Sequence, residues 1–374
     1  MSGWPFMVFA VLFAAVVCLH FYLAYRAWRG SREEQAADID PEYVRMEDYF
    51  ARSFRRKVAA WIALPARSAA PDGSRVIRKG RELIRVTSSA EYPPQSRLDD
   101  ILVVQGAFRC LAGCVFSREI YAKEDARIGA GTRLQSIAAD GNLELENGVH
   151  VARWADCAGD MTLGAGSAVT ARATAGKSIL LHPGARAGSL FAPTVSTSTQ
   201  PPQSPALPAA PQARKLEIPP PAGTGGAADY GREIDRSRLN RLSGECLLYD
   251  GDLKPSVPVL LRIAMVVKGD CLLAAGSVLE GDLKAEGRIF IGESSICRGN
   301  VVAGGDIRFG ASCRFYGVVH AGKKLRLGRG VRGGGEGANV AAFAGEALVV
   351  EEDVIVHGKL ASADHVMVTS GAVR

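Results

Sequence analysis

The sequence lacks the features that mark several classes of protein. Glycine is abundant, at 42 of 374 residues, but it does not recur at every third position, which excludes a collagen triple helix. The net charge of +6 is not carried by the body of the chain. Residues 26–97 hold 15 Lys and Arg against 10 Asp and Glu, whereas residues 98–262 hold 17 of each kind. A nucleic-acid-binding domain needs a basic face on its folded body, so we expect no nucleic acid among the partners.

Residues suited to catalysis or metal binding are also few. Cys110 and Cys114 form a single C-x3-C pair without a second Cys/His cluster, so a zinc site is not expected. Residues 176–178, Gly-Lys-Ser, end like a phosphate-binding loop, but Ala171 occupies the place of that loop's first glycine. No histidine has an obvious Ser or Cys nucleophile arranged with it. The sequence therefore predicts a protein that is not an enzyme, with no catalytic residue, cofactor or metal.

A long apolar run lies at the N-terminus. From Trp4 to Tyr25 only a proline and a histidine interrupt it, and a helix of these 22 residues spans roughly 33 Å, enough for a bilayer core of ~30 Å. No basic residue precedes the run and no small-residue cleavage site follows it, which favours an uncleaved anchor over a signal peptide. We expect a single transmembrane helix in residues 1–25. The arginines that follow place the N-terminus outside and the bulk of the chain in the cytoplasm.

The region after the anchor, residues 26–97, is basic, and part of it has helical periodicity. Between residues 43 and 62, apolar side chains recur at helical spacing with basic ones between them. Such a helix can lie on anionic headgroups, or it can pack as a soluble helix on its own domain. The pattern leaves both interpretations open. The basic residues assigned to the membrane-proximal surface are Arg26, Arg29, Arg32, Arg52, Arg55, Arg56 and Lys57.

The strongest signal is an 18-residue repeat in residues 263–374. Apolar and polar residues alternate within each unit, which predicts strands whose every second side chain points inward. Eighteen residues form three short faces, and each coil can bury its apolar side by stacking on the next, about 4.8 Å away. We expect a triangular parallel β-solenoid of six turns, with a glycine-rich insertion near residues 333–339 that shifts the register by five. Its predicted core includes Ile289, Ile291, Ile307, Phe309, Leu325 and Leu327.

The same period recurs less regularly in residues 98–191, which we interpret as a first solenoid. Residues 192–228 hold nine of the 18 prolines and predict a disordered linker. Residues 229–262 are expected to cap the second solenoid. Four cysteines fall on inward positions, where cysteine acts as a small hydrophobe: Cys157, Cys271, Cys297 and Cys313.

Two runs of the repeat resemble the bactofilins, the polymer-forming cytoskeletal proteins of bacteria. They are GDLKAEGRIFIG from Gly281 and GNVVAGGDIRFG from Gly299, and the resemblance is good over about 263–332 but weaker over 98–191. It implies a right-handed parallel β-helix, end-to-end assembly into a homopolymer without nucleotide, and scaffolding of protein clients at the inner membrane. Typical members have one solenoid and short tails, whereas this chain is expected to have two solenoids, a long linker and an anchor.

The last coil is the expected polymerisation surface. A terminal coil exposes unpaired backbone N–H and C=O groups, which invite another chain unless something covers them. The sequence shows no polar helix after the last repeat. The proposed edge consists of Leu348, Val350, Val366 and Val368.

Two other functions compete with a membrane-anchored, self-assembling scaffold. A hexapeptide-repeat acyltransferase has a left-handed β-helix whose coils also contain 18 residues. The segments that begin at Ile128, Leu163 and Ile291 look like the hexads of such a repeat. However, the aliphatic-glycine step occurs about once per coil here rather than three times. A binding module for glycans or cell-wall enzymes is the third class, but the outward positions show no aromatic ladder. The scaffold is the interpretation that the sequence favours.

Overall fold

The computed structural model describes residues 46–64, 68–69, 74–80, 82–197, 216–218, 234–243, 246–335 and 338–369, together with 13, 17–19, 21–22 and 25. The chain divides into two compact units, residues 1–49 and 50–374. None of the described helical segments is both long and apolar enough to cross a bilayer. Most of the predicted anchor, and with it Arg26, Arg29 and Arg32, lies outside the described residues.

The described part of residues 50–374 forms a parallel β-solenoid of about 14 turns with a spacing of about 18 residues, which confirms the prediction of an all-β parallel solenoid. The register shows the repeat directly, because Ile289 lies opposite Ile307, and Ile307 opposite Leu325. The glycine-rich insertion lengthens one coil, so that Val319 pairs with Ala342.

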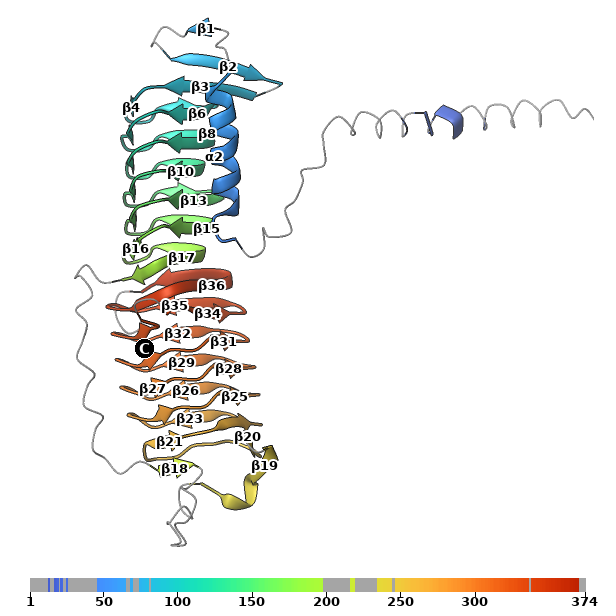
Figure 1. Ribbon diagram of the computed structural model, residues 1–374, viewed down its shortest axis with the longest axis vertical. Helices are drawn as coiled ribbons and strands as arrows, with labels where there is room; N and C mark the ends of the chain where they lie inside the picture. The colour runs from blue at the N-terminus through green and yellow to red at the C-terminus, as the bar shows by residue number, and fades with distance from the viewer. Residues whose placement is uncertain are drawn as a thin grey trace, which may run out of the picture. The chain divides into compact units, whose positions relative to one another are not determined.

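The first solenoid is made of strands β3–β17. Its strands are β3 (Glu82–Thr87), β4 (Ala90–Tyr92), β5 (Arg97–Leu98), β6 (Ile101–Val104), β7 (Phe108–Cys110), β8 (Val115–Ala122), β9 (Ala126–Ile128), β10 (Arg133–Ala139), β11 (Leu143–Leu145), β12 (His150–Val151), β13 (Trp154–Cys157), β14 (Met161–Leu163), β15 (Ala168–Ala175), β16 (Ser178–Leu181) and β17 (Arg186–Ser196). Strands β1 (Ser68–Ala69) and β2 (Arg75–Lys79) add to its first coil in antiparallel fashion. Helix α2 (Tyr49–Ile62) covers one face (Figure 1).

The second solenoid is made of strands β18–β36. Its elements are β18 (Leu216–Ile218), the 3-10 helix η3 (Arg236–Arg238), β19 (Leu239–Ser243), β20 (Cys246–Tyr249), β21 (Val259–Leu261), β22 (Ala264–Val267), β23 (Cys271–Leu273), β24 (Val278–Leu279), β25 (Leu283–Ala285), β26 (Ile289–Ile291), β27 (Ile296–Cys297), β28 (Val301–Ala303), β29 (Ile307–Phe309), β30 (Arg314–Phe315), β31 (Val319–Ala321), β32 (Leu325–Leu327), β33 (Arg332–Gly333), β34 (Val340–Ala344), β35 (Ala347–Val350) and β36 (Ile355–Val368).

The element boundaries differ from the predicted ones. The first solenoid begins at β3 rather than at residue 98 and continues to Ser196, because β3 pairs in parallel with β6 and β17 with β15. Strand β18 lies within the predicted linker, yet it pairs with β21 and its Ile218 is buried. Strands β20 and β21 of the predicted cap belong to the parallel ladder, whereas β19 turns back antiparallel on β20. Residues 198–215 and 219–228 of the predicted linker lie outside the described residues.

Inward and outward positions alternate as a solenoid requires. The six residues assigned to the core are each at most 1% exposed, because each packs on its counterparts in the coils above and below. At the turns, side chains of one coil accept hydrogen bonds from backbone amides 18 residues later. The Asp270 N–H donates to Oδ1 of Asp252 at 2.9 Å, and the Arg288 N–H donates to Oδ1 of Asp270 at 2.8 Å. These bonds satisfy amide groups that the short turns would otherwise leave unpaired.

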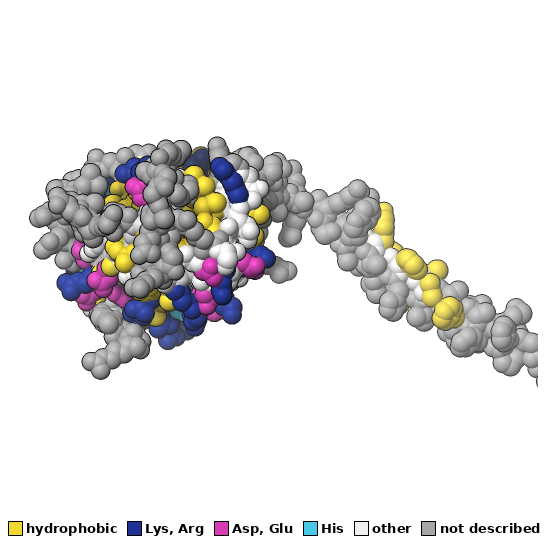
Figure 2. All heavy atoms as spheres, turned by 90° about the horizontal axis from the view of Figure 1, so that it is seen from below, with side chains coloured by type: hydrophobic (Ala, Val, Ile, Leu, Met, Phe, Trp, Pro, Cys, Tyr) yellow, Lys and Arg dark blue, Asp and Glu magenta, His cyan; other side chains and the backbone are white. Residues whose placement is uncertain are grey.

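The charged side chains are mixed in sign on the end of the rod at which β18 and β19 lie. Viewed from that side, Lys and Arg groups lie among Asp and Glu groups around the rim (Figure 2). Ion pairs link neighbouring coils there, such as Lys268 Nζ with Asp250 Oδ1 at 3.6 Å.

Candidate functional site

The C-terminal edge that we predicted to be free is occupied within the chain. Strand β36 pairs antiparallel with β17, from Arg186 opposite Met367 to Ser196 opposite Ile355. The Val368 N–H donates to the Ala185 carbonyl at 3.1 Å. This pairing, which we name the junction, corrects the prediction of an open edge at Leu348, Val350, Val366 and Val368. Both solenoids end in a coil without a cap of its own, so each coil satisfies the other's backbone groups.

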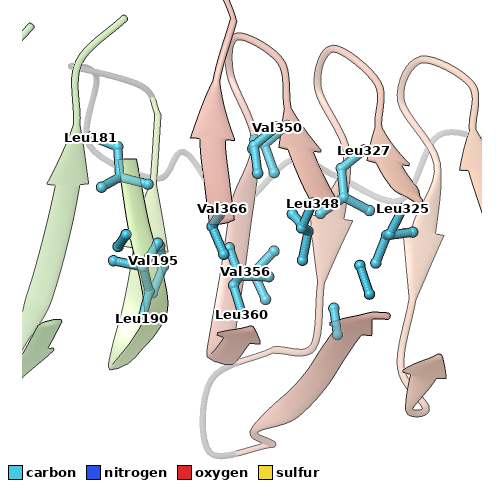
Figure 3. Close-up of a cluster of buried hydrophobic side chains, with 14 of the residues drawn as sticks. Leu181, Leu190, Val195, Leu325, Leu327, Leu348, Val350, Val356, Leu360 and Val366 are labelled. Atoms are coloured by element: carbon cyan, nitrogen blue, oxygen red, sulfur yellow. The ribbon is translucent and has the colours of Figure 1, made fainter. Parts of the chain in front are cut away.

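The apolar interior continues through the junction. Leu190 lies opposite Leu360, and both are 1% exposed. Figure 3 shows the side chains of Leu181 and Val195 on one side and those of Val356 and Val366 on the other. Closing the two coils on each other therefore removes two apolar cross-sections from water at once, which is the main driving force for such contacts.

Side chains from both solenoids add specific contacts at one edge of the junction. The Thr197 hydroxyl donates to the Glu351 carbonyl at 2.8 Å and accepts from the Val354 N–H at 2.9 Å. His357 Nδ1 lies 3.0 Å from the Pro193 carbonyl oxygen, which requires that nitrogen to carry the proton. These contacts fix the register of the two strands.

The second feature is helix α2, which packs on the outward face of the first solenoid. Phe54, Val58 and Trp61 are buried against the sheet, and the Phe54 and Trp154 rings meet edge-on with centroids 5.7 Å apart. The apolar side of the helix is therefore covered by protein. Of the two interpretations that the sequence left open, the structure shows the helix packed on its own domain.

Arg55 joins α2 to the sheet through two carboxylates. Its Nη1 lies 2.5 Å from Asp156 Oδ1, and its Nε lies 2.7 Å from Asp140 Oδ1. Tyr121 donates to Oδ2 of Asp140 at 2.5 Å, and Thr174 donates to Asp156. Burial alone would lower the pKa of Arg55, but the two carboxylates, Asp156 foremost, raise it above its ordinary value. The charge on this group is thus held in place by its partners.

Arg55 is accordingly not a membrane-facing residue, in contrast to its sequence assignment. Its side chain is 26% exposed, and its donors are used by the sheet. Arg52, Arg56 and Lys57 are exposed on the outward side of α2. Sequence reasoning missed the carboxylate partners because Asp140 and Asp156 lie 85 and 101 residues away. The one available signal was Asp156 itself, an acidic residue within an otherwise apolar strand.

A shallow depression of about 280 Å³ lies on the first solenoid, beside Arg127, Glu146 and His182. Arg127 Nη2 contacts Glu146 Oε1 at 2.9 Å, so the charges in the depression already pair with each other. No set of three or more Cys, His, Asp or Glu side chains is arranged to bind a metal among the residues described.

The inward cysteines are buried, as their repeat positions predicted. Cys157 is 3% exposed and Cys271 is fully buried. Burial raises the pKa of each of these thiols to about 12, and that of Cys110 to about 11. Because the thiolate is the reactive form, these groups are poor nucleophiles near neutral pH.

No protein-family model, curated protein or solved structure matches this chain.

Proposed function

We propose that this protein is a non-enzymatic structural scaffold of the bactofilin type, anchored to the bacterial inner membrane by residues 1–25. Its bulk lies in the cytoplasm, where the rod formed by the two solenoids holds protein clients. The resemblance of residues 263–332 to the bactofilins supports the proposal and extends it to right-handed winding of the coil. Assembly through a free C-terminal edge is not part of it, because the junction occupies that edge.

The observation that carries the proposal is the continuity of the rod. One apolar core runs from the first solenoid through the junction into the second, and neighbouring coils are linked by backbone hydrogen bonds along its length. A body bonded in this way resists bending and keeps points on its surface at fixed distances. That property suits a protein that positions others.

The way in which α2 is held also suits a tethered rod. The helix lies within the basic region, residues 26–97, and it is fixed to the sheet both by buried aromatic rings and by the ion pairs of Arg55. A force that acts on α2 is thus borne by the solenoid rather than absorbed by a loose helix. Arg52, Arg56 and Lys57 provide positive charge on the outward side of α2, where anionic headgroups attract it.

The experiment compares the full chain with a variant that lacks residues 1–25, both expressed in a bacterium and crosslinked in living cells. We expect the full chain to remain with the membrane in high salt and to be released by detergent. The truncated variant should be soluble and crosslink to the same proteins, which then leave the membrane with it. Clients that stay at the membrane when the anchor is removed would contradict the scaffold. Binding of acetyl-CoA to the purified chain would instead favour an acyltransferase.

A further inference from the structure

We propose that the junction also forms between two copies of this chain, so that the first solenoid of one copy binds the second solenoid of another. This inference goes beyond the scaffold proposal and rests only on the geometry of the junction and on the length of chain that connects the solenoids. It makes the second copy of the chain the partner, and β17 and β36 the interaction surface.

The junction has the character of an interface between two bodies. Each solenoid holds its own stack of coils, and the contact between them is made by one terminal strand from each, β17 and β36. The contacts require only the end of the first solenoid and the end of the second. Examples are the pairing of Leu190 with Leu360 and the hydrogen bond from Thr197 to Glu351. Every contact of the junction can therefore form identically within one chain or between two chains.

The connecting segment is long enough to allow the exchange. Thr197 lies beside β36, because its N–H donates to the Val354 carbonyl, whereas Leu216 begins β18 at the opposite end of the second solenoid. The ladder from β18 to β36 passes through β21, β24, β27, β30 and β33, so it has six steps and spans ~29 Å. The 18 residues from 198 to 215 can extend to ~65 Å. The excess, more than ~30 Å, lets the second solenoid leave its own partner and reach the first solenoid of an adjacent rod.

The balance between the two forms depends on concentration. Because the two solenoids belong to one chain, the intrachain junction has an effective concentration on the order of 1 mM, so separate, dilute chains close on themselves. At high concentrations of the chain, the junction between two copies competes with the intrachain one. We therefore expect single closed rods in dilute solution and exchanged pairs or rows of rods where the chain is concentrated.

The side-chain contacts favour unlike partners. Thr197 and Pro193 belong to the first solenoid, whereas their partners Glu351, Val354 and His357 belong to the second. A junction between two second solenoids lacks the Thr197 hydroxyl and the Pro193 carbonyl that these groups bind. Exchange should therefore join first to second solenoids and not like to like.

The test uses cysteine pairs across the junction in the full-length chain. Ser189 and Ala361 are direct partners in the antiparallel ladder, and such residues lie within the Cα separation that a disulfide requires. Cys18 and Cys246, the two cysteines that are not buried, are first changed to Ser. Ser189→Cys and Ala361→Cys are then placed either together in one chain or separately in two chains that are co-expressed and oxidised. Exposed Val318→Cys, away from the junction, replaces Ala361→Cys as the control.

The double variant should form an intrachain disulfide at low concentration. The two single variants should form a covalent heterodimer whose share rises at least several-fold with concentration, while the Val318→Cys control forms none above background. An intrachain disulfide without any heterodimer, even at the highest concentration, would show that the junction never exchanges. Homodimers of the single variants without the heterodimer would show like-to-like pairing, and no disulfide in the double variant would disprove the junction. Each of these three results overturns the inference, and none bears on membrane attachment or on clients.

Discussion

The two solenoids differ in what covers the sheet that they share. In the first, α2 packs on the outward side, so that all four residues of β6 and all four of β13 are buried. In the second, strands of the same sheet such as β25 and β28 bury their first and last residues and leave the middle one exposed or half-exposed. A strand that is covered on both sides must be apolar on both sides, and this removes the alternation with period two.

The comparison shows that a covering helix changes which residues the sheet can hold on the covered side. Asp156 lies on the covered side with only 6% of its side chain exposed, and it is compatible with that place because Arg55 reaches it from the helix. No described helix covers the second solenoid, and there the outward positions hold residues as different as Lys284 and Val302. In the first solenoid, α2 and the sheet face beneath it therefore depend on each other. In the second solenoid, stability comes from the stacking of the coils.

The largest expected effect tests this comparison at matched positions. Val103 and Val302 both point outward from the shared sheet, but Val103 is fully buried under α2 and Val302 is half-buried. Val103→Asp should lower the free energy of unfolding by more than ~4 kcal/mol, because it places a charge without a partner between helix and sheet. Val302→Asp should lower it by less than ~1 kcal/mol. Chemical denaturation measures the free energy of unfolding of both variants. Equal decreases would show that α2 does not exclude water from the sheet at Val103.

The next effect concerns the ion pairs beneath the helix. Arg55→Ala leaves Asp156 buried without its cation, which should cost ~3 kcal/mol. Arg56→Ala removes the same kind of side chain from the exposed side of α2 and should cost less than ~0.5 kcal/mol. Only Arg55→Ala should expose Trp61 and Trp154 to water, which tryptophan fluorescence would detect. If both variants behave alike, Arg55 does not hold the helix.

The smallest effect lies in the turns of the second solenoid. Arg288 hydrogen-bonds Asp270 through its side chain and its backbone, and these bonds lower the pKa of Asp270 below its ordinary value. Because the folded pKa lies below the unfolded one, the contribution to stability is present above about pH 4 and is lost as the pH falls through the folded value. Arg288→Ala should move the pKa of Asp270 back towards the ordinary value, as an NMR titration would show. An unchanged pKa would mean that the backbone amide alone sets it.

The coils of the second solenoid could be predicted from the sequence because most of their contacts are with the neighbouring coils, which are close in the chain. Ile307 and Phe309 repeat what Ile289 and Ile291 do one coil earlier, and the register follows from that spacing alone. The shift at the glycine-rich insertion also followed, since Leu348 restores the pattern after it. Local periodicity is sufficient wherever each coil contacts only its neighbours.

The junction and the packing of α2 on the sheet could not be predicted in this way. The apolar residues Val366 and Val368 indicate that the last coil is covered. They do not indicate whether strand β17 of the same chain or a strand of another chain covers it. Likewise, the spacing of Phe54, Val58 and Trp61 shows that a helix has an apolar side without showing whether lipid or sheet covers it. Contacts such as those of Arg55 with Asp140, 85 positions apart, and of Ala185 with Val368, 183 positions apart, leave no period in the sequence.

The central claim, that the two solenoids close on each other through their C-terminal coils, is tested most directly by hydrogen exchange of the full-length chain with and without Leu360→Asp. In the unchanged chain we expect the amides of β17 and β36 to be protected as well as those of β32. Leu360→Asp places a carboxylate opposite Leu190, and protection should then fall in both β17 and β36 while β32 is unaffected. Protection that falls in β36 alone, with β17 unchanged, would contradict the account, because the two strands would then not depend on each other.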